Sequence, residues 1–234
     1  MNALRNACAV ALIAGAVTQA TDVRVAVFGL FHPRQVETVR LRGDQFILRV
    51  PGRIERRFRG QLEIVRSGDE LFPVVTMDVE TAVASIVAAE SPPGAGLESL
   101  KAQAAVARSY LLAAGPRHPH SDYCDTTHCQ FLREPPAADS RAALAARATA
   151  GMVLIHEGRV IEALYSADCG GTTREFTSGR YPYFSVSCPV RSDVPSGHRL
   201  GLCQVGAAAM ALRGATWLDI LARYFPAATL AARK

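Results

Sequence analysis

The sequence lacks several features that would assign the chain to a specialised class. It has no internal repeat and no long low-complexity tract, and its apolar stretch at residues 7–17 is too short for a comfortable transmembrane helix. No Lys followed by Ser or Thr comes after the Gly170-Gly171 pair, which excludes a phosphate-binding loop there. No nucleic-acid-binding motif is present either. These absences leave a compact folded domain as the simplest interpretation.

What the sequence does contain fits one exported domain. Its 234 residues, 49% of them hydrophobic, suffice for one domain with its own core. Residues 1–20 are predicted to be a signal peptide, with Arg5 in the basic region and Thr18-Gln19-Ala20 as the cleavage site. We therefore expect the protein in the periplasm, cell wall or extracellular space, with an uncleaved membrane anchor as the alternative. The net charge of +5 favours an anionic polymer such as a cell-wall glycan.

The expected fold class is α+β, in a single compact domain at residues 21–234. Short alternating runs separated by Gly, Pro and polar turns predict an antiparallel β-sheet region at residues 21–77. Residues 53–60, RIERRFRG, carry four arginines and are predicted to be a solvated sheet edge. A helical core with a β-hairpin is expected at residues 78–234, and Glu157-Gly158 is the hairpin turn. Helices are predicted between residues 78 and 112 (two), and at 139–149, 204–212 and 216–224.

Glu90 is the most informative residue of the first helix. Asp78 is a good N-cap, and the apolar residues that follow repeat at the spacing of one buried helical face. Glu90 continues this face and lies in the last turn, because two prolines and a glycine follow at 92–94. Partial burial and the negative end of the helix dipole both raise the pKa of a carboxyl group, as a general acid requires. The alternative is a helix-end glutamate that points into water.

Two cations flank the apolar stripe of the second helix. Lys101 and Arg108 are seven residues apart, so both lie on one side of that helix. They could face the region of Glu90, or they could form a solvated basic edge, which is the commoner arrangement for such residues.

Cysteine and histidine residues gather in residues 118–129. Cys124, His128 and Cys129 lie close together, and His118 and His120 precede them by a short loop. Two thiolates with one or two imidazoles match the tetrahedral preference of zinc. A structural zinc ion is therefore predicted here, with Cys124–Cys129 disulfide formation as the alternative in an oxidising compartment.

Four ordered segments resemble the SpoIID/LytB family, which comprises stage II sporulation protein D and the amidase-enhancer domain. The first is the helix ending in Glu-x-Pro at residues 90–92, which continues into LESLKAQAAVARSYLLA. The others are CDTTHCQ at 124–130, YSADCGGTT at 165–173 and GHRLGLCQVGAAAMALRG at 197–214. The resemblance covers most of the chain and is weaker in the N-terminal strands.

The resemblance implies a lytic transglycosylase that acts on peptidoglycan glycan strands without stem peptides, and it implies a bound zinc ion. Glu90 would be the catalytic residue, and His118, Cys124, His128 and Cys129 would be the candidate metal ligands. A tight Gly-Gly turn would let the glycan pass close to the backbone. The residues expected to contact substrate are Lys101, Arg108, Gln130, Tyr165, Gly170, Gly171, Thr172, His198 and Gln204.

The number of cysteines suggests how the remaining ones are arranged. Without Cys8 the chain has five cysteines, an odd number. With two of them on the metal, Cys169 and Cys188 are expected to form a disulfide, and Cys203 is left as a free buried thiol.

The last segment departs from the family at two positions. Arg199 stands where a second Gly is typical, and Cys203 stands where many relatives have Ser. A nucleophile pair of Cys203 and His198 is set aside, because no oxyanion-hole motif and no third orienting residue accompany it.

A single favoured carboxylate points to one reaction. Ordinary glycosidases use two carboxyl groups, but Asp125 and Asp168 are more easily explained as turn residues than as a partner of Glu90. A lytic transglycosylase needs one acid, which protonates the glycosidic oxygen and then accepts a proton from the C6 hydroxyl of N-acetylmuramic acid. The alternative function is a non-catalytic amidase enhancer that binds the cell wall or an N-acetylmuramoyl-L-alanine amidase.

Overall fold

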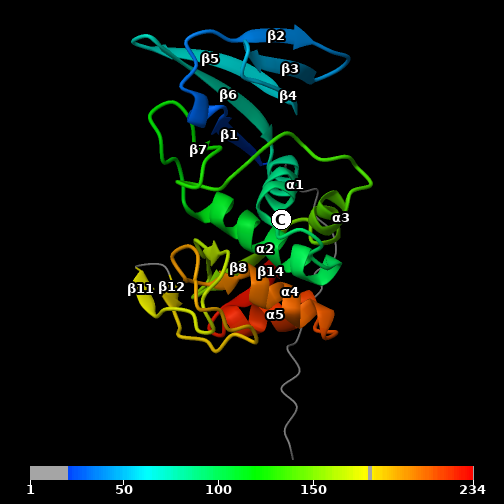
Figure 1. Cartoon of the computed structure of the whole chain (residues 1–234), viewed down its shortest axis with the longest axis vertical. Coiled ribbons are helices and arrows are strands. Elements are labelled where there is room, and N and C mark those ends of the chain that lie inside the picture. The colour runs from blue at the N-terminus through cyan, green and yellow to red at the C-terminus, as the bar shows by residue number, and fades with distance from the viewer. Residues whose placement is uncertain (1–20, 179–180, 234) are drawn as a thin grey trace, which may run out of the picture.

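The N-terminal third of the chain forms two sheets at one end of the molecule (Figure 1). The structure is a computed structural model that describes residues 21–178 and 181–233, so the predicted signal peptide lies outside the described residues. One sheet has the strand order β5-β6-β1-β7 and the other has the order β2-β3-β4. Their strands are β1 Asp22–Ala26, β2 Glu37–Arg40, β3 Gln45–Val50, β4 Ile54–Arg59, β5 Gln61–Ser67, β6 Glu70–Asp78 and β7 Tyr123–Cys124, with a 3-10 turn at Gly29–Phe31.

Alternation of apolar and polar residues produces this region, as the sequence predicts. In β3, Phe46, Leu48 and Val50 are buried, while the residues between them are half-buried. Strand β4 is an edge of its sheet, as predicted for the arginine-rich segment. Arg56 differs from a solvated edge residue, because it is largely buried and lies 3.6 Å from Asp125.

Three helices occupy the middle of the molecule (Figure 1). They are α1 Val79–Glu90, α2 Leu97–Ala113 and α3 Arg141–Ala148. The side chain of Asp78 caps α1 by accepting hydrogen bonds from the backbone N–H groups of Glu80 and Thr81. Both predicted helices of residues 78–112 are therefore confirmed, and α1 ends at Glu90 as expected.

The described residues after α3 form short strands and two helices. Strands β8 and β9 form the predicted hairpin, and its turn residues Glu157 and Gly158 have φ values of 48° and 76°, the left-handed pair that a two-residue hairpin turn requires. No helix of the described part of the chain is long and apolar enough to cross a membrane. The elements are β8 Met152–His156, β9 Arg159–Val160, β10 Tyr165–Ser166, β11 Phe176–Ser178, β12 Tyr181–Tyr183, β13 Leu202–Cys203, α4 Gln204–Leu212, α5 Trp217–Tyr224 and β14 Thr229–Ala232.

Helix α2 separates two hydrophobic cores. Ala104 and Ala107 face the core shared with α1 and the N-terminal sheets. Ala102, Ala105 and Val106 face the core shared with β8, α4 and α5. The predicted fold class, α+β, is confirmed.

Arg108 of α2 is completely buried, so neither position considered for it from the sequence is right. Its guanidinium group pairs with the Glu80 carboxylate, with a separation of 2.5 Å between Nη2 and Oε2. It also donates hydrogen bonds to the backbone carbonyls of Ala104, Ala146 and Met152. Arg108 therefore joins α1, α2, α3 and β8, and it cannot contact a substrate.

We expect Arg108→Met to destabilise the protein strongly. Removing one partner of a buried ion pair typically costs about 3–5 kcal/mol, and three carbonyls would lose a donor. Chemical denaturation should show a lower midpoint. Arg59→Ala, which breaks an exposed pair with Asp44, is the matched control and should leave the midpoint almost unchanged. Equal effects of the two substitutions would contradict the assignment.

Candidate functional site

The carboxyl group of Glu90 is held by groups from distant parts of the chain. The backbone N–H of Phe131 donates to Glu90 Oε1 at 2.6 Å. The side chain of Gln204 donates to the Glu90 backbone carbonyl at 2.9 Å. The hydroxyl of Tyr165 lies near the Glu90 side chain and acts to lower its pKa. The end of α1 is thereby fixed against the segments that carry these residues.

Glu90 lines a cavity of about 280 Å³. The cavity also contains Gln130, Tyr165, His198 and Gln204, four of the residues expected to contact substrate. They come from the loop after β7, from β10, from the loop before β13 and from the start of α4. The fold therefore brings together residues from all four sequence segments that were singled out.

Burial raises the pKa of Glu90. Loss of hydration is the largest cause, because it disfavours the charged form. The hydrogen bond from Phe131 and the nearby Tyr165 hydroxyl oppose this effect by stabilising the carboxylate. The expected direction is confirmed, and Glu90 does not point into open water.

The neighbours of Glu90 hold one another in place. The Tyr165 hydroxyl donates to Gln130 Oε1 at 3.2 Å, and Gln130 Nε2 donates to the carbonyl of Ala107 on α2 at 3.3 Å. Because burial and the nearby Glu90 carboxylate raise the pKa of Tyr165 well above its usual value, its hydroxyl stays protonated and remains a donor.

His198 lies at the cavity wall with a lowered pKa. Partial burial of the imidazole is the largest cause of the lowered pKa, because it disfavours the charged form, and the positive charge of Arg174 lowers the pKa further. The ring nitrogen Nδ1 accepts a hydrogen bond from the backbone N–H of Leu200 at 3.0 Å. A neutral His198 therefore presents hydrogen-bonding capacity without charge.

Glu90 is the only carboxylate among the described residues that line this cavity. Asp125 instead accepts hydrogen bonds from the backbone N–H groups of Phe28 and Gly29. Asp168 accepts one from Gly170 in its own turn. Both aspartates therefore have structural partners, as their interpretation as turn or loop residues predicts.

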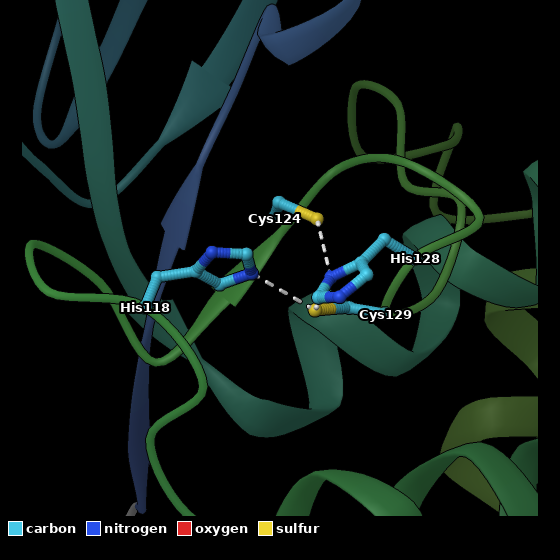
Figure 2. Close-up of side chains that lie close together, drawn as sticks. All are labelled: His118, Cys124, His128 and Cys129. Carbon is cyan, nitrogen blue, oxygen red and sulfur yellow. Dashed lines mark hydrogen bonds between the residues drawn. The ribbon is translucent and has the colours of Figure 1, made fainter.

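The predicted metal ligands converge on one point (Figure 2). Nε2 of His118 lies 3.2 Å from Sγ of Cys129, and Nδ1 of His128 lies 3.9 Å from Sγ of Cys124 and 3.7 Å from Sγ of Cys129. All four ligand atoms lie within 4.8 Å of one another. His120, the third histidine of this region, packs against Phe72 and is not in the cluster.

These four residues could hold a metal ion. Tetrahedral zinc with bonds of about 2.0–2.3 Å places its ligand atoms about 3.3–3.8 Å apart, close to the separations within the cluster. The Cys129 thiol beside Cys124 lowers the pKa of the Cys124 thiol, which favours the thiolate that a metal binds. The cluster also adjoins the cavity, because Cys129 lines it and Phe131, two residues on, donates to Glu90.

Comparison with known families assigns the central part of this architecture. Residues 67–156 match the family model described as SpoIID, stage II sporulation protein. This match supports the resemblance to the SpoIID family found in the sequence. It also supports a cell-wall-related protein of the sporulation type. A search of curated proteins found no match.

The SpoIID match covers only part of the cavity. It contains Glu90, Gln130 and the four candidate metal ligands, whereas Tyr165, His198 and Gln204 lie beyond residue 156. The segments at 165–173 and 197–214 rest on their sequence resemblance and on their place at the cavity.

Two cations expected at the substrate lie elsewhere in this chain. Lys101 forms an ion pair with Glu98 at 2.6 Å and does not line the cavity. Arg108 is completely buried and pairs with Glu80, as described above. Their seven-residue spacing puts both residues on one side of α2, as predicted. There Lys101 pairs with Glu98 and Arg108 pairs with Glu80, and neither faces the cavity.

The glycine turn was also expected at the substrate, and it lies outside the cavity. A Cβ on Gly170 would lie 3.2 Å from Pro195, and one on Gly171 would lie 3.1 Å from Arg191. Thr172 forms a bridge with Ser187. This turn therefore packs against residues 187–195, and its glycines permit that close approach.

Arg199, the departure from the family's glycine, keeps the backbone conformation that glycine favours. Its φ is 66°, in the left-handed region. Its guanidinium donates to the carbonyl of Thr172 at 3.0 Å. Arg199 therefore joins the loop before Gln204 to the glycine turn at residues 170–172.

One contact at the site had no signal in the sequence. The donor to the Glu90 carboxylate is the backbone N–H of Phe131, which any residue other than proline would supply. Only its place directly after CDTTHCQ could have suggested it.

The disulfide expected between Cys169 and Cys188 is absent. Both are free thiols, as is the buried Cys203. The three sulfur atoms lie within 4.8 Å of one another, so Cys203 is a close neighbour of both. Burial of the Cys203 thiol is confirmed.

We expect the purified chain to carry zinc at the four-residue cluster. Cys124→Ser, His118→Ala and His128→Ala should each lower the zinc content and the thermal midpoint, because all three side chains face one point. His120→Ala is the matched control and should keep the metal. Elemental analysis with calorimetry tests this, and a Cys124–Cys129 disulfide in fully stable, zinc-free protein would contradict it.

Proposed function

We propose that this protein is a lytic transglycosylase that cleaves peptidoglycan glycan strands, with glycans lacking stem peptides as substrate. The observation that carries the proposal is one carboxyl group of raised pKa in a cavity whose other described lining residues include no second acid. Hydrolysis by two carboxyl groups needs a pair about 5–9.5 Å apart, whereas intramolecular closure needs only one.

The reaction would proceed in two proton transfers through Glu90. The protonated carboxyl gives its proton to the glycosidic oxygen, and the bond from C1 to that oxygen breaks. The resulting carboxylate takes the proton from the C6 hydroxyl of N-acetylmuramic acid as that oxygen bonds to C1. A 1,6-anhydro ring forms, Glu90 regains its proton, and no water is consumed.

The surrounding residues support these steps. The Phe131 N–H orients the carboxyl by holding Oε1, and the Tyr165 hydroxyl stabilises the carboxylate formed after the first transfer. Gln130, His198 and Gln204 supply neutral polar groups that suit sugar hydroxyl and acetamido groups. We assign no part to Lys101 or Arg108, because neither lines the cavity.

The same proposal includes zinc, a location and a partner. Zinc bound by His118, Cys124, His128 and Cys129 would act as a structural cross-link, which steadies the loop that carries Phe131. Export to the cell wall follows from the predicted signal peptide and from the proposed substrate. Peptidoglycan is the partner, and an N-acetylmuramoyl-L-alanine amidase would supply strands without peptides.

The Glu90→Gln substitution tests the catalytic role. Glutamine keeps the shape and the acceptor for Phe131 but cannot transfer a proton, so anhydro-muramic ends should fall below detection. Loss of a general acid costs roughly 10²–10⁴-fold or more. The assay is mass spectrometry of amidase-treated glycan strands after incubation in oxygen-18 water, in which the wild-type product should carry no label.

The matched control is Glu157→Gln, the same change in the exposed hairpin turn, and it should cleave at the wild-type rate. Wild-type activity in Glu90→Gln would overturn the mechanism, and labelled reducing ends would indicate hydrolysis. A wild type that never cleaves, yet stimulates an added amidase, would establish the amidase-enhancer function instead.

The pH profile provides a second test of Glu90. Only the protonated carboxyl can begin the reaction, so activity should fall as pH rises through its pKa. Burial raises this pKa, and the fall should therefore come above the ordinary glutamate value of about 4.3. Tyr165→Phe removes a nearby hydroxyl that favours the carboxylate, and should move the fall to still higher pH. Initial rates against pH would measure this, and an unmoved profile would contradict it.

The same shift predicts how stability depends on pH. A glutamate with a raised folded-state pKa stabilises the protein below its unfolded-state pKa, and this contribution is lost as pH rises through the folded-state value. Glu90→Gln lacks this loss. Its thermal midpoint should match that of the wild type in acid and equal or exceed it at neutral pH.

A further inference from the structure

A second sulfur cluster lies in the C-terminal core. The thiols of Cys169, Cys188 and Cys203 are within 4.8 Å of one another, and the three residues are 0%, 6% and 0% exposed. They come from the turn after β10, the loop after β12, and the end of β13 where α4 begins. Among the described residues, no histidine or carboxylate belongs to this cluster.

Backbone N–H groups lie near the three sulfur atoms. Cys203 Sγ accepts a hydrogen bond from the N–H of Cys169 at 3.3 Å. The N–H groups of Gly171, Val190 and Gly206 act to lower the pKa of the Cys169, Cys188 and Cys203 thiols, respectively. Such donors stabilise thiolate over thiol, and they are the outer contacts that thiolate ligands of metal ions typically have.

The space around the sulfur atoms is closed. The Tyr224 hydroxyl lies 3.4 Å from Cys188 Sγ. A Cβ added to Gly206 would collide with both of these atoms, so α4 can pack here only with glycine at this position. A site without room for a water ligand favours an ion that is satisfied by three sulfur atoms.

We propose that Cys169, Cys188 and Cys203 form an all-sulfur site for a soft metal ion, Cu(I). Soft thiolate ligands select Cu(I) among the common ions, whereas zinc requires a fourth ligand. Three sulfur atoms in a plane around one ion, at bonds of about 2.3 Å, are about 4 Å apart, which the cluster accommodates. Binding releases thiol protons to solvent and involves no change in oxidation state. This site replaces the disulfide expected from the sequence.

The test uses the zinc-loaded full chain with Cys8→Ser, so that the proposed zinc site stays intact and already occupied. It is titrated with Cu(I) without oxygen, against a competing Cu(I) chelator. About one equivalent should bind, X-ray absorption should find three sulfur ligands, and the thermal midpoint should rise. Cys188→Ser in this background should weaken binding by at least about 100-fold.

Two glycine substitutions provide a second test, which remains informative if Cys188→Ser does not fold. Gly206→Ala keeps all three sulfur atoms but displaces Cys188, so it should weaken Cu(I) binding. Gly96→Ala is the matched control, because its Cβ would meet Ala211 at an ordinary 3.6 Å, and its binding should not change. The proposal is overturned by undiminished binding in Cys188→Ser, by nitrogen or oxygen ligands, or by a disulfide between any two of the three cysteines in metal-free protein.

Discussion

Burial of α2 on nearly all sides is the constraint on which the rest of the structure depends. One core lies between this helix and the N-terminal sheets, and the other lies between it and α4, α5 and β8. Only small side chains allow neighbours to approach a helix from both sides, and Ala102, Ala104, Ala105 and Ala107 are all fully buried. Arg108 is the exception among them. Its buried charge is tolerated because Glu80 and three carbonyls surround it, and the same contacts fix α1 relative to α2.

The position of Glu90 follows from this arrangement. Helix α1 is held against α2. Its last residue, Glu90, therefore lies beside two other segments that pack on α2: the loop after β7 and the start of α4. Phe131 is 41 residues away in sequence and Gln204 is 114 residues away, yet both contact Glu90. The acid therefore lies between the two halves of the fold, where its carboxyl loses water and its pKa rises. A glutamate at a freely solvated helix end would keep an ordinary pKa.

Local patterns predicted local structure well and packing partners poorly. The N-cap at Asp78, the end of α1 at Glu90, the Glu157-Gly158 turn and the bounds of α4 agree with the structure, because each depends on residues within one or two turns. The role of Arg108 was wrong, because helical spacing gives the flank of a residue but not what covers that flank. The Phe131 contact was missed because it is a backbone group. The Cys169–Cys188 pairing rested on a count, and a count cannot show that Cys203 lies in the same cluster.

The two cysteine clusters, at residues 118–129 and at Cys169, Cys188 and Cys203, lie where the strands beside the cavity are very short. Strands β7, β10 and β13 have two residues each, and ladders of that length contribute few hydrogen bonds. Yet Cys124 ends β7 and Cys203 ends β13. Each cluster is followed closely by a residue that contacts Glu90: Phe131 comes two residues after Cys129, and Gln204 directly follows Cys203. A bound ion would join three or four segments at one point without a longer strand. The position of Glu90 therefore depends on these short segments, through the Phe131 N–H and the Gln204 side chain.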